Sequence, residues 1–171
     1  VGQLKEEEAA AKELYGPIYA KYSAMALEDV AQDVQALKMG QRVFSNNCAV
    51  CHGSDARGGH GFPNLTDNDW LYGGAPETIK TSITNGRNGV MPPWGVVLGE
   101  EGSENVTQYV LTLSGREADA AKAAAGEVQY KVICVACHGL DGKGNPLLGS
   151  PDLTDGTWLY GGSATRIKQS I

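Results

Sequence analysis

The sequence lacks an uninterrupted apolar segment of the roughly 18 residues that a membrane-spanning helix requires. Its most apolar run, Val90–Leu98, is interrupted by Pro92 and Pro93. Positive charge is also in deficit, since 14 lysines and arginines against 20 acidic residues leave a net charge of −6. This balance argues against a nucleic-acid-binding protein, which needs a basic surface. It favours a basic protein as a partner.

Aromatic residues are scarce as well, at 7% of the chain. A domain of roughly 70–80 residues rarely stabilises itself by side-chain burial alone, so a large flat cofactor would supply much of the missing core. The chain starts at Val1 and shows no signal peptide. We therefore expect either a processed N-terminus or a piece of a longer chain, with room for a membrane anchor upstream.

The four cysteines fall in two copies of one pattern, Cys48-Ala49-Val50-Cys51-His52 and Cys134-Val135-Ala136-Cys137-His138. The pattern C-x-x-C-H is typical of covalent attachment of a c-type haem, because two thiols add to its vinyl groups and the next imidazole binds its iron. We therefore predict two haem c groups held by these cysteines, with His52 and His138 as iron ligands. Since such haems are attached outside the cytoplasmic membrane, the expected location is periplasmic.

Three other interpretations explain the cysteines less completely. A redox-active cysteine pair, a zinc site built from both pairs and plain disulfides all leave the histidine after each pair unexplained. A zinc site would also have to join Cys51 and Cys134 across 82 intervening residues, far beyond the usual spacing of a zinc ribbon.

The two motifs lie within a longer internal repeat. Upstream of the motifs, Gly40 and Phe44 correspond to Gly126 and Tyr130 at an offset of 86. Directly downstream, Asp55 and Gly58 match Asp141 and Gly144 at the same offset. After a two-residue insertion the offset is 88, and the matching pairs are Pro63 and Pro151, Leu65–Asp67 and Leu153–Asp155, Trp70–Gly74 and Trp158–Gly162, Ile79–Lys80 and Ile167–Lys168, and Ser82–Ile83 and Ser170–Ile171. The chain therefore consists of two haem units in tandem.

Apolar periodicity, capping residues and glycine-rich stretches predict an all-α fold with long haem-wrapping loops. The expected helices are Val34–Ser45 with Asp33 as N-cap, Ala75–Ile83, Gly102–Leu113 and Ala120–Ile133, and the expected loops are His52–Asp69 and Asn85–Leu98. We expect an acidic leader over residues 1–33, a first cytochrome c domain over 34–114 and a second, incomplete one over 119–171.

Within the leader, a helix over Leu4–Leu14, a break at Gly16-Pro17 and a short second helix over Ile18–Met25 are expected. The leader could serve as a docking arm or as a solvated connector.

Two later helices carry an apolar face suited to burial. This face is formed by Val34, Leu37, Val43 and Phe44 in one helix and by Val106, Tyr109, Val110 and Leu113 in the other.

A haem that only transfers electrons needs a second axial ligand, and Met91 is the candidate in the first unit. It lies 39 residues after His52, in a loop where glycines allow a tight fold and Pro92 and Pro93 stiffen the chain. The alternative is a methionine that packs in an apolar core. His60 follows His52 by only eight residues, so we expect it at the surface or near a propionate.

The haem propionates need hydrogen-bond donors. The candidates are Arg57, Trp70 and Arg87 in the first unit, and Lys143 and Trp158 in the second. A buried tryptophan needs a partner for its N–H, and a propionate would provide one. For Arg57 and Lys143, the alternative is a solvated loop charge.

The stretch Cys48–Gly58, followed by Gly61–Leu65, resembles one family among the tandem class I cytochromes c, as does the leader up to Gly40. This family is the dihaem cytochrome c subunit, subunit III, of the bacterial cbb-type haem–copper cytochrome c oxidase. The resemblance covers nearly the whole chain. It implies transmembrane helices upstream of the haem domains, so that this chain would be the periplasmic part of an inner-membrane complex.

The same resemblance implies a function without a catalytic centre in this chain. The subunit takes electrons from a soluble donor cytochrome c. It passes them through a monohaem cytochrome c subunit to the catalytic subunit, which reduces oxygen and pumps protons. By the family pattern, the carbonyls of Pro63 and Pro151 accept hydrogen bonds from the Nδ1–H groups of His52 and His138.

Two other functions stay open. One is a free periplasmic dihaem cytochrome c carrier, which would have a signal peptide in place of the leader. The other is a dihaem enzyme, such as a peroxidase or a thiosulfate dehydrogenase, which needs an open or unusually ligated haem beside acid–base residues. No spare histidine is well placed for that role.

The second unit departs from the pattern because its distal methionine is absent. At the offset of 88, Met91 maps to about position 179, beyond Ile171. We therefore expect the natural chain to continue past Ile171. The continuation should supply a distal methionine for the second haem and one more amphipathic helix, which packs against the helix of Gly126 and Tyr130.

Overall fold

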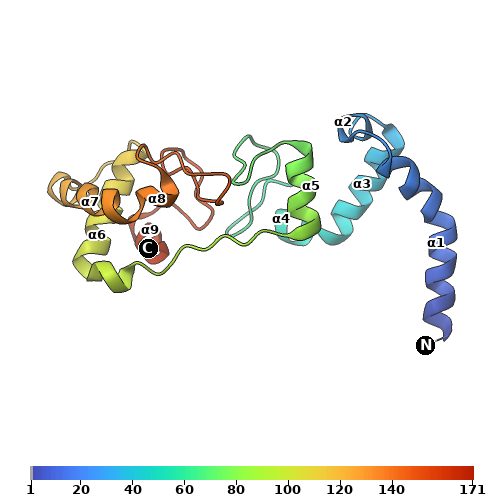
Figure 1. Cartoon of the computed structure of the whole chain (residues 1–171), viewed down its shortest axis with the longest axis horizontal. Helices are drawn as coiled ribbons and strands as arrows, with labels where there is room; N and C mark the ends of the chain where they lie inside the picture. The colour runs from blue at the N-terminus through green and yellow to red at the C-terminus, as the bar shows by residue number, and fades with distance from the viewer. Residues whose placement is uncertain (1) are drawn as a thin grey trace. The chain divides into compact units, whose positions relative to one another are not determined.

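The computed structural model describes residues 2–171, and every regular element in that range is a helix. The helices are α1 (Gly2–Ser23), α2 (Leu27–Val30), α3 (Val34–Asn47), α4 (Ala49–His52), α5 (Pro76–Asn85), α6 (Gly95–Leu113), α7 (Ala120–Ile133), α8 (Val135–His138) and α9 (Ala164–Ser170), as labelled in Figure 1. Two isolated bridges join Gly59 to Phe62 and Asn145 to Ser150, at equivalent places of the two repeats. The expected all-α class is confirmed.

The chain divides into two compact units, one that ends at Val50 and one over Cys51–Ile171. These two compact units do not coincide with the two haem units of the repeat. The domain limits that the repeat predicts, at residues 34–114 and 119–171, stay a prediction. Among the described residues, no helix combines the length and the apolar character needed to cross a membrane.

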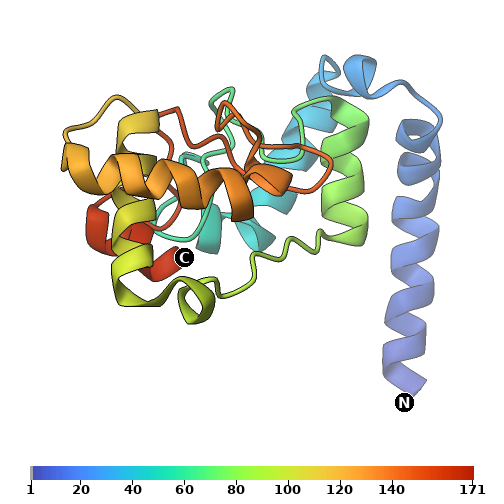
Figure 2. The same ribbon diagram turned by 60° about the vertical axis from the view of Figure 1, so that its left-hand side comes forward.

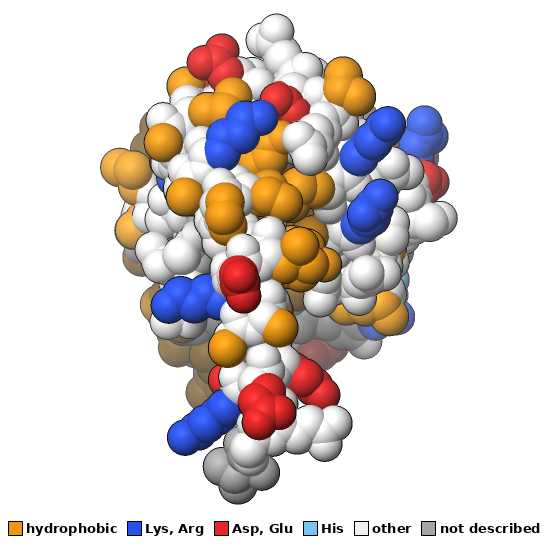
Figure 3. Space-filling view, turned by 90° about the vertical axis from the view of Figure 1, so that its right-hand side faces the viewer, with side chains coloured by type: hydrophobic (Ala, Val, Ile, Leu, Met, Phe, Trp, Pro, Cys, Tyr) orange, Lys and Arg blue, Asp and Glu red, His pale blue; other side chains and the backbone are white. Residues whose placement is uncertain are grey.

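In the first unit, α1 continues without interruption through Gly16 and Pro17, so the expected break in the leader is wrong. A proline inside a helix removes one backbone hydrogen bond. Because α1 has no buried residue, water can satisfy the carbonyl that loses its partner. The exposed apolar side chains of α1 are Leu4, Leu14, Tyr15 and Tyr19. Figure 3 shows hydrophobic, acidic and basic side chains interspersed on the face that it draws.

Asp33 is the N-cap of α3, as expected, and its carboxylate accepts hydrogen bonds of 2.9 Å from the N–H groups of Gln35 and Ala36. The same carboxylate accepts a 2.9 Å hydrogen bond from the Tyr22 hydroxyl and lies 3.4 Å from Nζ of Lys21. Together with the N–H of Ala36, the Tyr22 hydroxyl lowers the pKa of Asp33 to about 2. Asp33 thus joins the end of α1 to the start of α3.

The apolar side of α3 is exposed, contrary to expectation. Val34, Leu37 and Val43 are each more than half exposed, and no residue of this helix is buried. An apolar stripe shows which side of a helix suits a core, but the stripe becomes buried only where another element packs on it.

The core of the second unit lies where α7 packs across α6 and α9 packs beside α6 (Figures 1 and 2). Its buried apolar cluster consists of Val106, Val110, Leu111 and Ile167. Gly126 lets α7 approach α6 closely, since a Cβ at this position would lie 2.0 Å from the carbonyl oxygen of Asn105. The prediction that a helix from beyond Ile171 packs against α7 stays a prediction, and among the described residues α7 packs against α6.

The bounds of α7, Ala120–Ile133, are those that the sequence predicts, whereas α6 begins at Gly95 instead of Gly102. Gly99 explains the difference. With φ at +67° and ψ at −176°, it separates a short first segment of α6 from the longer helix that follows. The predicted helix therefore corresponds to the longer segment, and the first segment falls within the predicted loop Asn85–Leu98.

In the second unit, the loops that follow the two haem motifs touch each other. The N–H of Gly61 donates to the carbonyl of Leu159 at 2.8 Å. The Thr157 hydroxyl donates to the Asp69 carboxylate at 2.6 Å. Positions 69 and 157 are equivalent in the repeat, so corresponding points of the two loops meet.

Candidate haem sites

Each motif histidine is oriented by a proline carbonyl in the loop that follows it. Nδ1 of His52 lies 3.1 Å from the carbonyl oxygen of Pro63, and Nδ1 of His138 lies 3.1 Å from that of Pro151. A carbonyl can only accept a hydrogen bond, so Nδ1 carries the proton and the lone pair of Nε2 is left to bind iron. These contacts confirm the pairs that the family resemblance implies.

Gly58 and Gly144 allow each loop to return to its histidine. Their φ angles are +71° and +75°, in the region that L side chains rarely adopt. Their N–H groups donate to the carbonyls of His52, at 2.7 Å, and His138, at 2.9 Å. A Cβ on either glycine would lie 2.6 Å from the proline carbonyl oxygen that accepts the histidine bond. A side chain at either position would therefore displace the histidine's partner.

The second histidine is the more enclosed of the two. His138 is only 7% exposed, and this burial lowers its pKa, which favours the neutral imidazole that binds metals. The hydroxyl of the fully buried Tyr130 donates a 2.9 Å hydrogen bond to the carbonyl of Gly139, directly after His138. The sequence analysis noted Tyr130 only as a repeat match and missed this contact, which Phe44 at the equivalent position cannot make.

The thiols of the two motifs are free. Cys48 and Cys134 are half-buried, and Cys51 and Cys137 are exposed. A motif whose thiols are free and whose histidine keeps Nε2 available fits a covalently attached haem, which when bound supplies an iron that gains and loses one electron. Among residues 2–171, no group of three or more His, Cys, Asp or Glu side chains could hold a bare metal ion.

Met91 lies between α5 and α6, in a stretch without regular structure, and it is 47% exposed. Its role as the distal ligand of the first haem stays a prediction. His60 is exposed, as expected, and its ring meets that of Tyr160 edge-on with 6.1 Å between the ring centroids.

Two of the basic propionate candidates already have partners within the protein. Nε of Arg87 donates to the Ser82 hydroxyl at 2.9 Å, and its Nη2 donates to the carbonyl of Thr78 at 3.2 Å. Nζ of Lys143 donates to the Thr154 hydroxyl at 2.7 Å. Both side chains keep further N–H groups, so their propionate roles stay predictions.

The tryptophan candidates lie in equivalent turns. Gly74 packs under Trp70 and Gly162 under Trp158, so that a Cβ on these glycines would lie 2.7 Å and 2.8 Å from the indole rings. Both tryptophans are half-buried, and Arg57 is exposed. Contacts of these three side chains with a propionate stay predictions as well.

Arg116, in the linker between α6 and α7, is a residue that the sequence analysis missed. Its guanidinium lies over the ring of Trp158, with Cζ 4.8 Å from the ring centroid. Its Nη1 donates to the carbonyl of Gly162, and its Nε donates to the Ser114 hydroxyl at 3.0 Å. The residue belongs to no motif and has no match in the repeat, so no pattern pointed to it.

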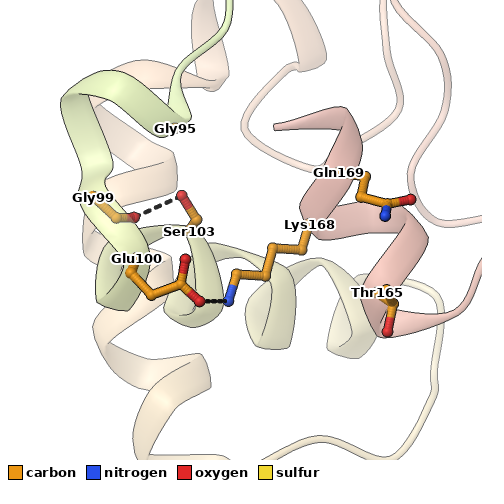
Figure 4. A pocket seen from close by; sticks show the side chains of 7 residues that line it. All are labelled: Gly95, Gly99, Glu100, Ser103, Thr165, Lys168 and Gln169. Atoms are coloured by element: carbon orange, nitrogen blue, oxygen red, sulfur yellow. Dashed lines mark hydrogen bonds and ion pairs between the residues drawn. The ribbon is translucent and has the colours of Figure 1, made fainter.

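A cavity of about 330 Å³ lies elsewhere, between α6 and α9, and contains no residue of either motif (Figure 4). Two of its lining residues, Glu100 and Lys168, form an ion pair at 2.5 Å, and Nζ of Lys168 also lies 3.4 Å from Glu104, outside the lining. Lys122 of α7 lies 3.6 Å from the same Glu104. These charges connect three helices of the core.

Comparisons with known proteins identify the family of the chain. The sequence profile of the family described as cytochrome c oxidase, cbb3-type, subunit III matches residues 35–110 and 121–171, which are the two repeats. The chain is 50% identical to the cbb3-type cytochrome c oxidase subunit CcoP of Rubrivivax gelatinosus, over 94% of this chain and 53% of that protein.

Two further relatives are the subunit FixP of Azorhizobium caulinodans and the subunit CcoP of Rhodobacter capsulatus. Each is 41% identical over 89% of this chain, which covers 56% and 60% of their lengths. The chain thus spans only between half and three-fifths of the length of these relatives. The profile match and these identities show that the chain belongs to the subunit III family of the cbb3-type cytochrome c oxidases.

Proposed function

We propose that this chain transfers single electrons through two covalently attached haem c groups, as part of a cbb3-type cytochrome c oxidase. One observation carries the proposal. In a chain of the subunit III family, each of two C-x-x-C-H histidines holds Nδ1 against a proline carbonyl and leaves Nε2 available.

The residues around each histidine serve to hold it still. The proline carbonyl sets the tautomer and the ring direction, and Gly58 or Gly144 brings the loop into place. At the second site, Tyr130 adds a hydrogen bond beside His138. An imidazole that keeps one orientation suits electron transfer, in which the ligands of the iron should move little.

The expected partners follow from the family. Electrons would come from a soluble donor cytochrome c and continue to a monohaem cytochrome c subunit and the catalytic subunit, where oxygen is reduced and protons are pumped. The net charge of −6 favours a basic donor by electrostatic steering. Covalent haem attachment supports a periplasmic position, with the membrane contact made by a segment upstream.

A potentiometric titration of the haem-loaded protein tests the electron-transfer function. Each haem should show a reversible one-electron transition, and the reduced protein should be reoxidised by a second cytochrome c. Rapid turnover of hydrogen peroxide or thiosulfate by this chain alone would contradict the proposal, because it would assign the haems to a catalytic reaction.

A further inference from the structure

We propose that Arg116 binds a propionate carboxylate of the haem attached at Cys134 and Cys137, with the Trp158 indole packed against its guanidinium. The proposal rests on the proposed haem attachment. It adds a cofactor-binding residue that lies in the linker before the second haem motif.

Two of the three guanidinium nitrogens of Arg116 form hydrogen bonds within the protein, and the third forms none. Nε and Nη1 donate to Ser114 and to the carbonyl of Gly162, and the Trp158 ring covers one face. Nη2 is inaccessible to solvent and has no hydrogen-bond partner in the protein. Arg116 therefore has a fixed position and one buried donor without a partner.

A buried, unpaired N–H on a charged group is unfavourable, because it loses its hydration without gaining an acceptor. Arginine cannot relieve this by losing a proton, since it stays charged in proteins. The acceptor that best fits a guanidinium is a carboxylate, whose oxygens match its fork of N–H groups. Nη2 of Arg116 is therefore suited to bind an anion.

The haem of the second motif brings carboxylates to this part of the unit. Cys134 and Trp158 both pack against the buried cluster formed by α6 and α9. A haem held by Cys134 therefore shares a core with the tryptophan that Arg116 covers. The N–H of Arg116 also donates to the carbonyl of Leu111, a member of this cluster, at 3.0 Å.

The first repeat has no equivalent arrangement. There, Arg87 lies over Tyr72, with Cζ 4.9 Å from the ring centroid, and it donates to residues of α5. No cation–π contact with Trp70 occurs in residues 2–171. A change at position 116 should therefore affect one haem only.

The test uses the protein with both haems attached and with ¹³C at the propionate carboxyls. Redox-difference infrared spectra and the potentials of both haems are measured for the wild type, Arg116→Gln and Arg116→Lys. Arg116→Gln should shift the labelled carboxylate bands of one haem and lower its potential, because a nearby cation stabilises ferrous iron. Arg116→Lys should shift the bands less, since lysine keeps the positive charge but lacks the planar set of N–H groups that matches a carboxylate.

The matched control is Arg166→Gln, which removes the same charge from an exposed position of α9, where Arg166 pairs with Gln169. It should leave the bands and both potentials unchanged. Labelled bands that stay in place in Arg116→Gln, or that move equally in the control, would overturn the proposal. If Arg116→Gln does not fold, unshifted bands in Arg116→Lys overturn it. A wild type without a second haem would instead contradict the proposed function.

Discussion

The orientation of each motif histidine depends on residues outside the C-x-x-C-H pattern. The pattern predicts His52 and His138 as iron ligands from the chemistry of haem attachment alone. The proline contacts follow from the family resemblance and are confirmed. No pattern predicted the Tyr130 hydroxyl or Arg116, because their partners are backbone carbonyls that only folding brings near.

Replacing Met91 tests the distal ligand of the first haem. A thioether ligand raises a haem potential, because neutral sulfur favours ferrous iron. Met91→Ala should therefore lower the potential of one haem and abolish its weak near-infrared sulfur-to-iron band. Met39→Ala is the control and should leave both unchanged. An unaltered band in Met91→Ala would point to another ligand, with His60 as the next candidate.

Asp33 should titrate far below an ordinary aspartate. Its folded pKa of about 2 lies under the ordinary value of 3.8, so its stabilising effect is complete above pH ~4. This contribution is lost as the pH falls from ~4 to ~2, when the carboxylate takes up a proton.

Carboxyl ¹³C NMR of Asp33 checks this titration. In Tyr22→Phe the pKa should rise towards its ordinary value, because one hydrogen bond to the carboxylate is gone. An Asp33 pKa near 3.8 in the wild type, or equal values in the two proteins, would show that the Tyr22 contact does not hold in solution.

Whether the sequence predicted the limits of a helix correctly depended on how local the sequence signal for those limits was. The N-cap Asp33 located the start of α3, because a cap acts within the first turn of a helix. The predicted start of α7 is also the one in the structure. The uninterrupted α1 escaped prediction because Pro17 weakens this exposed helix without ending it. The first segment of α6 escaped prediction because Gly99 separates it from the longer helix. Which face becomes buried, as the exposed α3 shows, depends on packing partners that periodicity does not name.

The repeat-equivalent glycines Gly126 and Gly40 allow a matched test of the α6–α7 contact. A Cβ at Gly126 would lie 2.0 Å from the Asn105 carbonyl oxygen, whereas nothing lies within 4 Å of one at Gly40. Gly126→Ala should therefore destabilise the second unit by about 1–3 kcal/mol or more through overpacking. Gly40→Ala should stabilise its helix by about 0.5–1 kcal/mol, because alanine loses less backbone entropy.

Denaturant unfolding of the haem-loaded variants, followed by circular dichroism, measures both effects. The midpoint should fall for Gly126→Ala and rise slightly for Gly40→Ala. Equal effects at both positions would contradict the close approach of α7 to α6.

For the molecule as a whole, the duplicated motif predicted two tandem haem units, and the family profile matches both repeats. What the duplication could not predict is how the repeats join. The Gly61–Leu159 and Asp69–Thr157 hydrogen bonds link the loops of one repeat to those of the other. Comparing the two copies shows which positions correspond but not which of them touch, so it does not reveal these contacts.

The central claim is that each C-x-x-C-H motif carries one thioether-bound haem. Intact mass measurement of the denatured protein, with a haem stain of the denaturing gel, tests this most directly. We expect a mass equal to the chain plus two haems, and one haem fewer in each of Cys48→Ser/Cys51→Ser and Cys134→Ser/Cys137→Ser. A wild-type mass with one haem or none, or zinc in place of iron, would contradict it.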